Sequence, residues 1–199
     1  KGDRQMSTMP VRLVIPDSGV LISLAHGQLL DALFSFSDDV RLTVTDVVQY
    51  EATLRTDLID TSRIKEFLKR NADRIKVDAT GFHKLIEQAI ENPAIELPKN
   101  IGEISIYGYI NDIRQDEPGI PVLVLFEDEW FLKNQYTRPR NTHLLSLAAF
   151  LKFLEKAIPG FSFDDAMDRI RNTRPHVNAI EKDIPASNVT TWKSKIRKR

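Results

Sequence analysis

One run in the sequence, "PVLVLF" at residues 121–126, is apolar at every position. A strand with one face in water alternates apolar and polar residues, so an unbroken apolar run is typical of a strand covered on both faces. Residues 11–15 form a second apolar run, rich in β-branched side chains, and residues 40–45 alternate as a strand does. Strands covered on both faces favour a parallel sheet with helices on each side.

Helical spacing of apolar residues fills the segments between these strands. The helical pattern begins after residue 19, with a break at Gly27, and begins again after residue 46. It also covers residues 61–72, 81–92, 101–113 and 148–157. Three shorter segments are predicted as a strand at 73–80, a short helix or turn at 127–134, and a final strand or helix start at 142–147.

This alternation of strands and helices predicts an α/β fold, a three-layer α/β/α sandwich with a central, mainly parallel sheet. Residues 11–159 would form that domain, and residues 160–199 a C-terminal helical extension with a basic tail. After Pro175 the sequence loses its periodicity.

Polar residues stand where three of these helices are expected to begin. A side-chain oxygen there can accept the free N–H groups of the first helical turn. The predicted caps are Thr45 or Asp46, Thr61 or Ser62, and Ser162, the last for a further helix at residues 163–172.

Composition narrows the class of protein. The chain has 199 residues, 42% apolar and 28% charged, as in ordinary globular domains, and no cysteine, which excludes disulfides and thiolate metal sites. No apolar run approaches the roughly 20 residues that span a bilayer, and the first ten residues contain no signal-peptide core. We therefore predict a cytoplasmic protein with no membrane partner.

The charge is balanced overall but unevenly placed. The last seven residues, "KSKIRKR", hold five basic residues and no acid, and without those five the remaining 23 basic residues face 28 acidic ones. A basic end on an acidic body is typical of contact with a polyanion or an acidic partner, and equally of a solvated tail.

Carboxylates come at or near the ends of the predicted strands. Asp17 directly ends the run at 11–15, and Glu127, Asp128 and Glu129 follow the run at 121–126. Glu51 lies in the helix after the second strand, and Glu103 lies in the first turn of the helix before residue 121. Ligands of open parallel sheets bind at the carboxyl ends of the strands, so these acids could share one site.

Each acid also has a structural explanation, as a turn residue, a helix cap or a solvated helix residue. Taken together, however, clustered carboxylates repel one another and raise their own pKa values unless a cation compensates them. Mg²⁺ or Mn²⁺ suits such oxygen ligands and, in the case of Mg²⁺, would keep several waters.

Four segments in this order resemble the PIN-domain ribonucleases: "VIPDSGVLISLA", "TDVVQYEATLR", "IGEISIYGYI" and "PVLVLFEDEWF". The family's four acids would fall on Asp17, Glu51, Glu103 and Asp128, and its small hydroxyl residue beside the first acid would be Ser18. The resemblance covers residues 11–159. Phe126 stands where the family often has Thr or Ser, which leaves open whether Glu127, Asp128 or Glu129 is the fourth acid.

The resemblance implies a metal-dependent endoribonuclease that cleaves single-stranded RNA. Asp17, Glu103 and Asp128 would bind Mg²⁺ or Mn²⁺, Glu51 would position the ion or a water, and Ser18 would donate to a ligand or a phosphate. It further implies a toxin of a bacterial toxin–antitoxin pair, with an antitoxin protein and a homodimer as partners; a housekeeping RNA-processing nuclease would have the same site.

Substrate RNA would need basic residues around an acidic pocket. The candidates are Arg55, Lys133, Arg138 and Arg140, with Tyr136 as a stacking surface for a base and the tail at 193–199 further away. The four histidines have no metal-ligand spacing, and we expect them to be ordinary core or surface residues.

Two alternatives belong to other classes. The first is a PIN-like RNA- or protein-binding module without activity, which the absent hydroxyl before Asp128 and the added C-terminal region favour. The second is a receiver-like phosphoacceptor domain, which needs paired acids early in the chain and a lysine after a late strand; we find neither pattern in the sequence.

Overall fold

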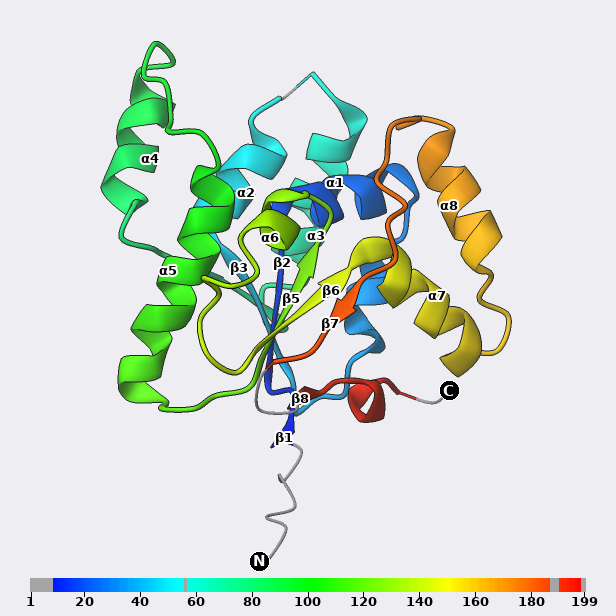
Figure 1. The fold of residues 1–199 in the computed structure, drawn as a ribbon. Coiled ribbons are helices and arrows are strands. Elements are labelled where there is room, and N and C mark those ends of the chain that lie inside the picture. The colour runs from blue at the N-terminus through cyan, green and yellow to red at the C-terminus, as the bar shows by residue number, and fades with distance from the viewer. Residues whose placement is uncertain (1–8, 56, 187–189, 198–199) are drawn as a thin grey trace, which may run out of the picture.

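A computed structural model describes residues 9–55, 57–186 and 190–197 of the chain. Its centre is a six-stranded sheet in the order β4-β3-β2-β5-β6-β7 (Figure 1). The strands are β2 Leu13–Pro16, β3 Arg41–Thr45, β4 Ile75–Asp78, β5 Val122–Phe126, β6 Thr142–Ser146 and β7 Asp183–Ile184. Each neighbouring pair is parallel except β6 and β7, which are antiparallel, so the predicted mainly parallel α/β sheet is confirmed.

Helices pack on this sheet. They are α1 Ser18–His26, α2 Asp46–Thr53, α3 Ile59–Arg70, α4 His83–Glu91, α5 Ile101–Asp116, α6 Trp130–Lys133, α7 Leu147–Ala157 and α8 Phe163–Arg171, with 3-10 turns η1 Leu30–Ser35 and η2 Lys193–Lys195. In the view of Figure 1, α5 and α6 lie in front of the sheet and α1 and α3 behind it. None of the described helices is long and apolar enough to cross a membrane.

The two apolar runs of the sequence form the middle of the sheet. Every residue of β2 and of β5 is buried, as expected for strands covered on both faces. Phe126, at the end of β5, contacts Phe131 of α6, which in turn contacts Tyr107 of α5. The burial of these residues fixes the carboxyl ends of β2 and β5 beside each other.

Two helix starts follow the predicted polar caps, one predicted cap is wrong, and a further helix is capped by Ser146, which was not predicted. Thr45 accepts a hydrogen bond from the N–H of Val48 at the start of α2, and Ser162 accepts one at the start of α8. The segment at 142–147 was predicted as a final strand or a helix start, and it contains both. Strand β6 ends at Ser146, and Ser146 caps α7, which begins at Leu147. The prediction that Thr61 or Ser62 caps α3 is wrong: the N–H of Leu58 donates to the carbonyl of Arg55 at 3.2 Å, and α3 begins at the next residue, Ile59, without a side-chain cap.

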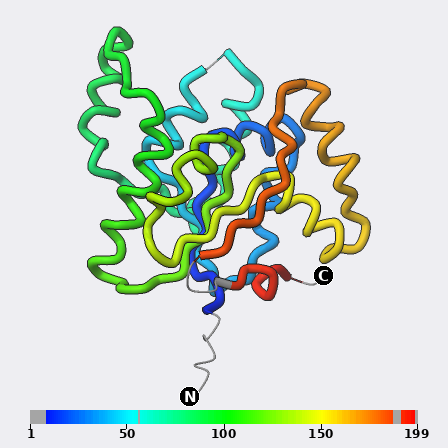
Figure 2. Tube along the Cα trace, viewed as in Figure 1, coloured from blue at the N-terminus to red at the C-terminus, as the bar shows by residue number. Residues whose placement is uncertain are grey.

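The C-terminal segment joins the same core, which the lost periodicity did not predict. It supplies β7, and Trp192 is buried against Phe150 and Phe153 of α7. Strand β1, Met9–Pro10, pairs in parallel with β8, Thr190–Thr191, and Figure 2 shows these two ends of the described chain side by side. The domain division at residue 160 stays a prediction.

Candidate functional site

Asp17 links the ends of the two central strands. It follows β2 directly and caps α1, where its Oδ1 accepts the N–H of Val20 at 2.7 Å. Its Oδ2 accepts the N–H groups of Glu127 at 2.9 Å and Asp128 at 3.4 Å, in the loop after β5. The side chain is buried, and burial raises the pKa of Asp17 to about 7 although the backbone N–H groups lower it.

Glu51 joins three helices at the same edge of the sheet. It extends from α2, accepts a hydrogen bond from Ser18 of α1, and accepts the N–H of Gly102 of α5 at 3.2 Å. Burial raises the pKa of Glu51, and the negative charge of Asp128 raises it further. Ser18 therefore interacts with one of the predicted acids, and its predicted contact with a metal ligand or a phosphate stays a prediction.

Glu103 lies in the first turn of α5, one residue after Gly102. Burial raises its pKa, and the charges of Glu51 and Asp128 add to the shift. Glu51, Glu103 and Asp128 thus lie close enough to repel one another, and Asp17 holds the backbone of Asp128. The structure brings the four predicted acids to one region.

The three acids after β5 have different surroundings. Glu127 is buried and forms an ion pair with Arg174 at 3.1 Å. Glu129 forms an exposed pair with Lys133 at 3.1 Å. Asp128 accepts the N–H of Trp130 at 2.7 Å and has no ion pair with any described residue. Of the three, Asp128 is therefore the one with a charge left for a ligand.

The four predicted acids share this lack of a cationic partner within the described part of the chain. Their oxygen atoms suit a hard divalent cation, and Asp17 uses three of its roughly four lone-pair sites on backbone N–H groups, which leaves about one. The chemistry of the residues therefore fits Mg²⁺ or Mn²⁺. As drawn, no three described acid or histidine side chains converge to coordinate an ion, so some would have to turn toward it.

Gly102 is a site residue that the sequence did not single out. A Cβ atom at this position would overlap the carboxylate of Glu51, lying 2.8 Å from its Cδ. The glycine therefore makes room for Glu51 against the start of α5. The only signal in the sequence was the Gly-Glu pair that opens this helix.

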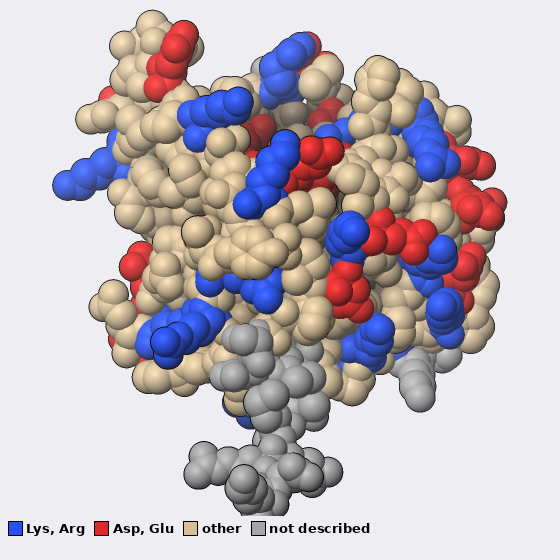
Figure 3. Space-filling view, viewed as in Figure 1, with Lys and Arg blue, Asp and Glu red and all other residues tan. Residues whose placement is uncertain are grey.

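The predicted RNA-binding residues are less uniform. Arg55 is exposed and pairs with Asp57, whereas one Nη of Arg138 donates to the carbonyl of Pro185 at 2.6 Å. Arg140 and Tyr136 are exposed. In the space-filling view, acidic side chains lie recessed in a hollow at the top of the molecule, near α1 and α2, with basic side chains beside it (Figure 3).

The basic tail lies away from this hollow. Its residues Lys193, Lys195 and Arg197 pair with Asp183, Asp39 and Asp38 respectively. Turn η2 lies beside β8 at the foot of Figure 1, at the end of the sheet opposite the acids. Lys198 and Arg199 of the predicted tail lie outside the described residues.

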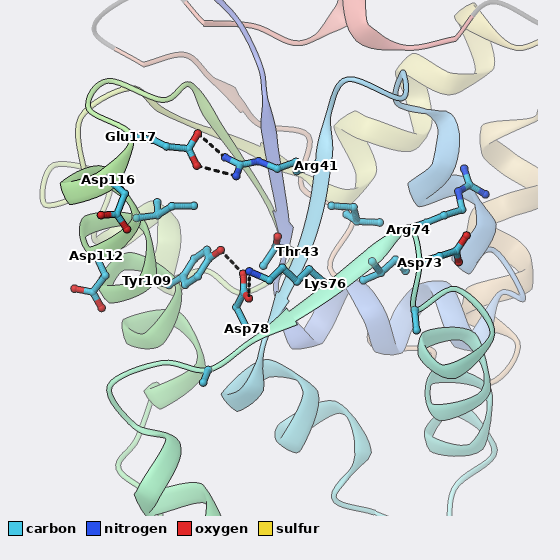
Figure 4. A pocket seen from close by; sticks show the side chains of 15 residues that line it. Arg41, Thr43, Asp73, Arg74, Lys76, Asp78, Tyr109, Asp112, Asp116 and Glu117 are labelled. Carbon is cyan, nitrogen blue, oxygen red and sulfur yellow. Dashed lines mark hydrogen bonds and ion pairs between the residues drawn. The ribbon is translucent and has the colours of Figure 1, made fainter.

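A separate cavity of about 720 Å³ lies between α5 and strands β3 and β4, of which β4 is at the edge of the sheet (Figure 4). Arg41 forms a bidentate pair with Glu117 there, and Asp78 accepts the hydroxyl of Tyr109 and pairs with Lys76. None of the predicted site residues lines it. Its central charged groups are satisfied by one another, so it is distinct from the acidic site.

No protein-family model matches this chain, and no curated protein matches it. The chain is an α/β protein with a mixed, mainly parallel six-stranded sheet.

Proposed function

We propose that this protein is a metal-dependent endoribonuclease of PIN type, which cleaves phosphodiester bonds in single-stranded RNA. The observation that supports the proposal most is the gathering of Asp17, Glu51, Glu103 and Asp128 at the carboxyl end of the sheet without a cationic partner among the described residues. Acids held in this way cost free energy unless an external cation compensates them.

In this proposal Asp17, Glu103 and Asp128 hold Mg²⁺ or Mn²⁺, and Glu51 positions the ion or a water. A divalent cation lowers the pKa of a bound water and offsets charge that develops on the phosphate. The backbone N–H groups from α1 and the loop after β5 fix the carboxylate of Asp17, and Ser18 orients that of Glu51. Arg55 and Arg140, both exposed, are the proposed phosphate contacts.

A toxin of a bacterial toxin–antitoxin pair is the biological role that we propose for this activity. An antitoxin, or a second copy of the chain, would cover apolar surface near the acids. Exposed apolar side chains do occur on the segments around the site: Leu54, Ile59, Ile90 and Ile104. A protein partner at this surface would bury them and block access to the hollow.

The test is cleavage of a single-stranded RNA by the purified protein with Mn²⁺, run beside isothermal calorimetry of Mn²⁺ binding. We expect the parent protein to bind Mn²⁺ and cut the RNA, EDTA to stop cleavage, and Asp17→Asn to lose both. RNA binding that survives EDTA, with no cleavage by the parent, would instead establish a binding module. The burial of Phe126 against Phe131, where the family often has a hydroxyl, is the observation that favours this second outcome.

A further inference from the structure

We propose that Arg174, in the segment after α8, is a positioning residue of the candidate site: through Glu127 it holds the loop that binds Asp17. The inference rests on the proposed function for its meaning, but its first measurement needs no metal and no RNA. It gives the C-terminal segment a role in the site, although that segment lies more than 40 residues after the last predicted acid.

The guanidinium of Arg174 makes three polar contacts at the base of the loop. Its Nη2 lies 3.1 Å from Glu127 Oε1, and its Nη1 donates to the hydroxyl of Ser23 at 2.8 Å and to the carbonyl of Gly19 at 3.0 Å. It therefore binds the first turns of α1 and the residue after β5 at the same time.

Glu127 makes further polar contacts besides its ion pair with Arg174. The hydroxyl of Ser23 donates to its Oε2 at 2.5 Å, and the N–H of Asn178 donates to its Oε1 at 3.3 Å. The side-chain amide of Asn178 also donates to the carbonyl of Glu127 at 3.1 Å. The C-terminal segment thus binds both the side chain and the backbone of Glu127.

The backbone of Glu127 and Asp128 is what Asp17 binds. Both N–H groups donate to Asp17 Oδ2, so a shift of Glu127 would move two of the three hydrogen bonds on that carboxylate. The start of α1 packs tightly against Glu127, because a Cβ at Gly19 would lie only 3.1 Å from the Cβ of Glu127. A continuous series of contacts therefore runs from Arg174 through Glu127 to Asp17.

The effect of replacing Arg174 on the loop depends on the loss of its charge more than on the loss of its volume. Glu127 is buried beside Asp17, and Arg174 is its one ion-pair partner within the described residues. Removing one partner of a buried pair leaves an uncompensated charge, whereas removing the charge of both partners does not. Replacement of Arg174 alone should therefore disturb the loop, and a second replacement that neutralises Glu127 should restore it.

The experiment compares Arg174→Met, Glu127→Gln and the double variant with the parent. Amide hydrogen exchange at residues 127 and 128, followed by NMR without metal, reports the bonds to Asp17. Calorimetry with Mn²⁺ reports the site itself. Arg171→Met is the matched control, because Arg171 lies at the end of α8 and pairs only with the exposed Asp168 among the described acids.

We expect Arg174→Met to exchange both amides at least about tenfold faster and to weaken Mn²⁺ binding by about 10- to 100-fold, the usual range for residues that support metal ligands. The double variant should return both quantities to within a few-fold of the parent, and Arg171→Met should change neither. A residue that only stabilised the fold would speed amide exchange throughout the protein, whereas a positioning role confines the faster exchange to the loop at residues 127 and 128.

Unchanged exchange in Arg174→Met, or a double variant as impaired as the single one, would overturn the inference. If Arg174→Met does not fold, Arg174→Gln takes its place, since it removes the charge but keeps a polar side chain; a parent-like exchange rate in that variant would also count against the inference. A parent that binds no Mn²⁺ and cuts no RNA would refute the proposed function, while the exchange data would still decide the role of Arg174.

Discussion

Asp17 combines burial with three hydrogen bonds to backbone N–H groups. The bonds favour the ionised carboxylate and burial favours the neutral acid, and burial prevails, which leaves the pKa at about 7. Individual residues of the candidate site could be predicted where their place next to an apolar run was a sufficient signal: Asp17 ends one such run, and Asp128 follows another. Gly102 was not, because its importance comes from Glu51, which lies 51 residues away.

The raised pKa of Asp17 predicts how stability depends on pH. Because the folded-state pKa of about 7 exceeds the unfolded value near 3.8, the protonated form stabilises the fold fully below about pH 4, and this contribution is lost as pH rises toward 7. We expect the free energy of unfolding of the metal-free parent, relative to Asp17→Asn, to fall by about 1 kcal/mol per pH unit between pH 5 and 7. Urea denaturation of both proteins at a series of pH values measures it; a constant difference would contradict the assignment.

Gly102 offers a second test at the scale of one residue. In Gly102→Ala the new methyl group would push the carboxylate of Glu51 aside, so we expect at least about a tenfold loss of Mn²⁺ affinity and of RNA cleavage. The fold should tolerate the change, since only the end of a flexible side chain must move. The control is Gly108→Ala in the same helix, where a Cβ would meet nothing within 4 Å. That variant should gain about 0.5–1 kcal/mol of stability from helix propensity and keep its metal affinity.

Secondary-structure elements were the most predictable level, because periodicity and caps are local. The all-apolar run became β5, and Thr45, Ser146 and Ser162 cap the helices that follow them. The misplaced start of α3 and the unpredicted strands β1, β7 and β8 have a common reason. These features depend on a turn or on pairing with a distant strand, and two-residue strands carry too few side chains to show a period.

The cap of α2 supports the helix that carries Glu51. Thr45 Oγ1 accepts the N–H of Val48 at 3.2 Å and lies 3.2 Å from the hydroxyl of Ser105. Thr45→Val keeps the shape but removes the acceptor, so we expect a loss of about 1 kcal/mol in the free energy of unfolding. The exposed turn residue Thr137 is the control, and Thr137→Val should cost less than about 0.5 kcal/mol. Equal effects of the two substitutions in urea denaturation would contradict the capping role.

At the scale of the whole molecule, the first and last strands of the described residues close the fold on the side away from the acids. β1 pairs with β8, and Trp192 fills a place against Phe150 and Phe153. Sequence patterns predicted a basic tail there but not its attachment, because the ion pairs of Lys195 and Arg197 join segments more than 150 residues apart. Long-range contacts of this kind, including the pair of Arg174 with Glu127, leave no trace in local spacing.

Trp192 should hold the C-terminal segment more strongly than the surrounding ion pairs do. We expect Trp192→Ala to lower the free energy of unfolding by about 3–5 kcal/mol, the usual cost of truncating a buried aromatic side chain. Arg197→Ala should have a much smaller effect, because its partner Asp38 is exposed and such pairs contribute little. Denaturation curves of both variants make the comparison; a larger loss in Arg197→Ala would show that charge, not burial, anchors this segment.

The antiparallel strand β7 has a consequence for behaviour at high concentration. It consists of two residues and lies at the outer margin of the sheet beside β6. So short a strand presents few unpaired peptide groups to a neighbouring molecule, and the opposite margin, β4, carries the charged residues Lys76 and Asp78. Both margins therefore discourage fibril growth by strand addition in concentrated solutions of the protein.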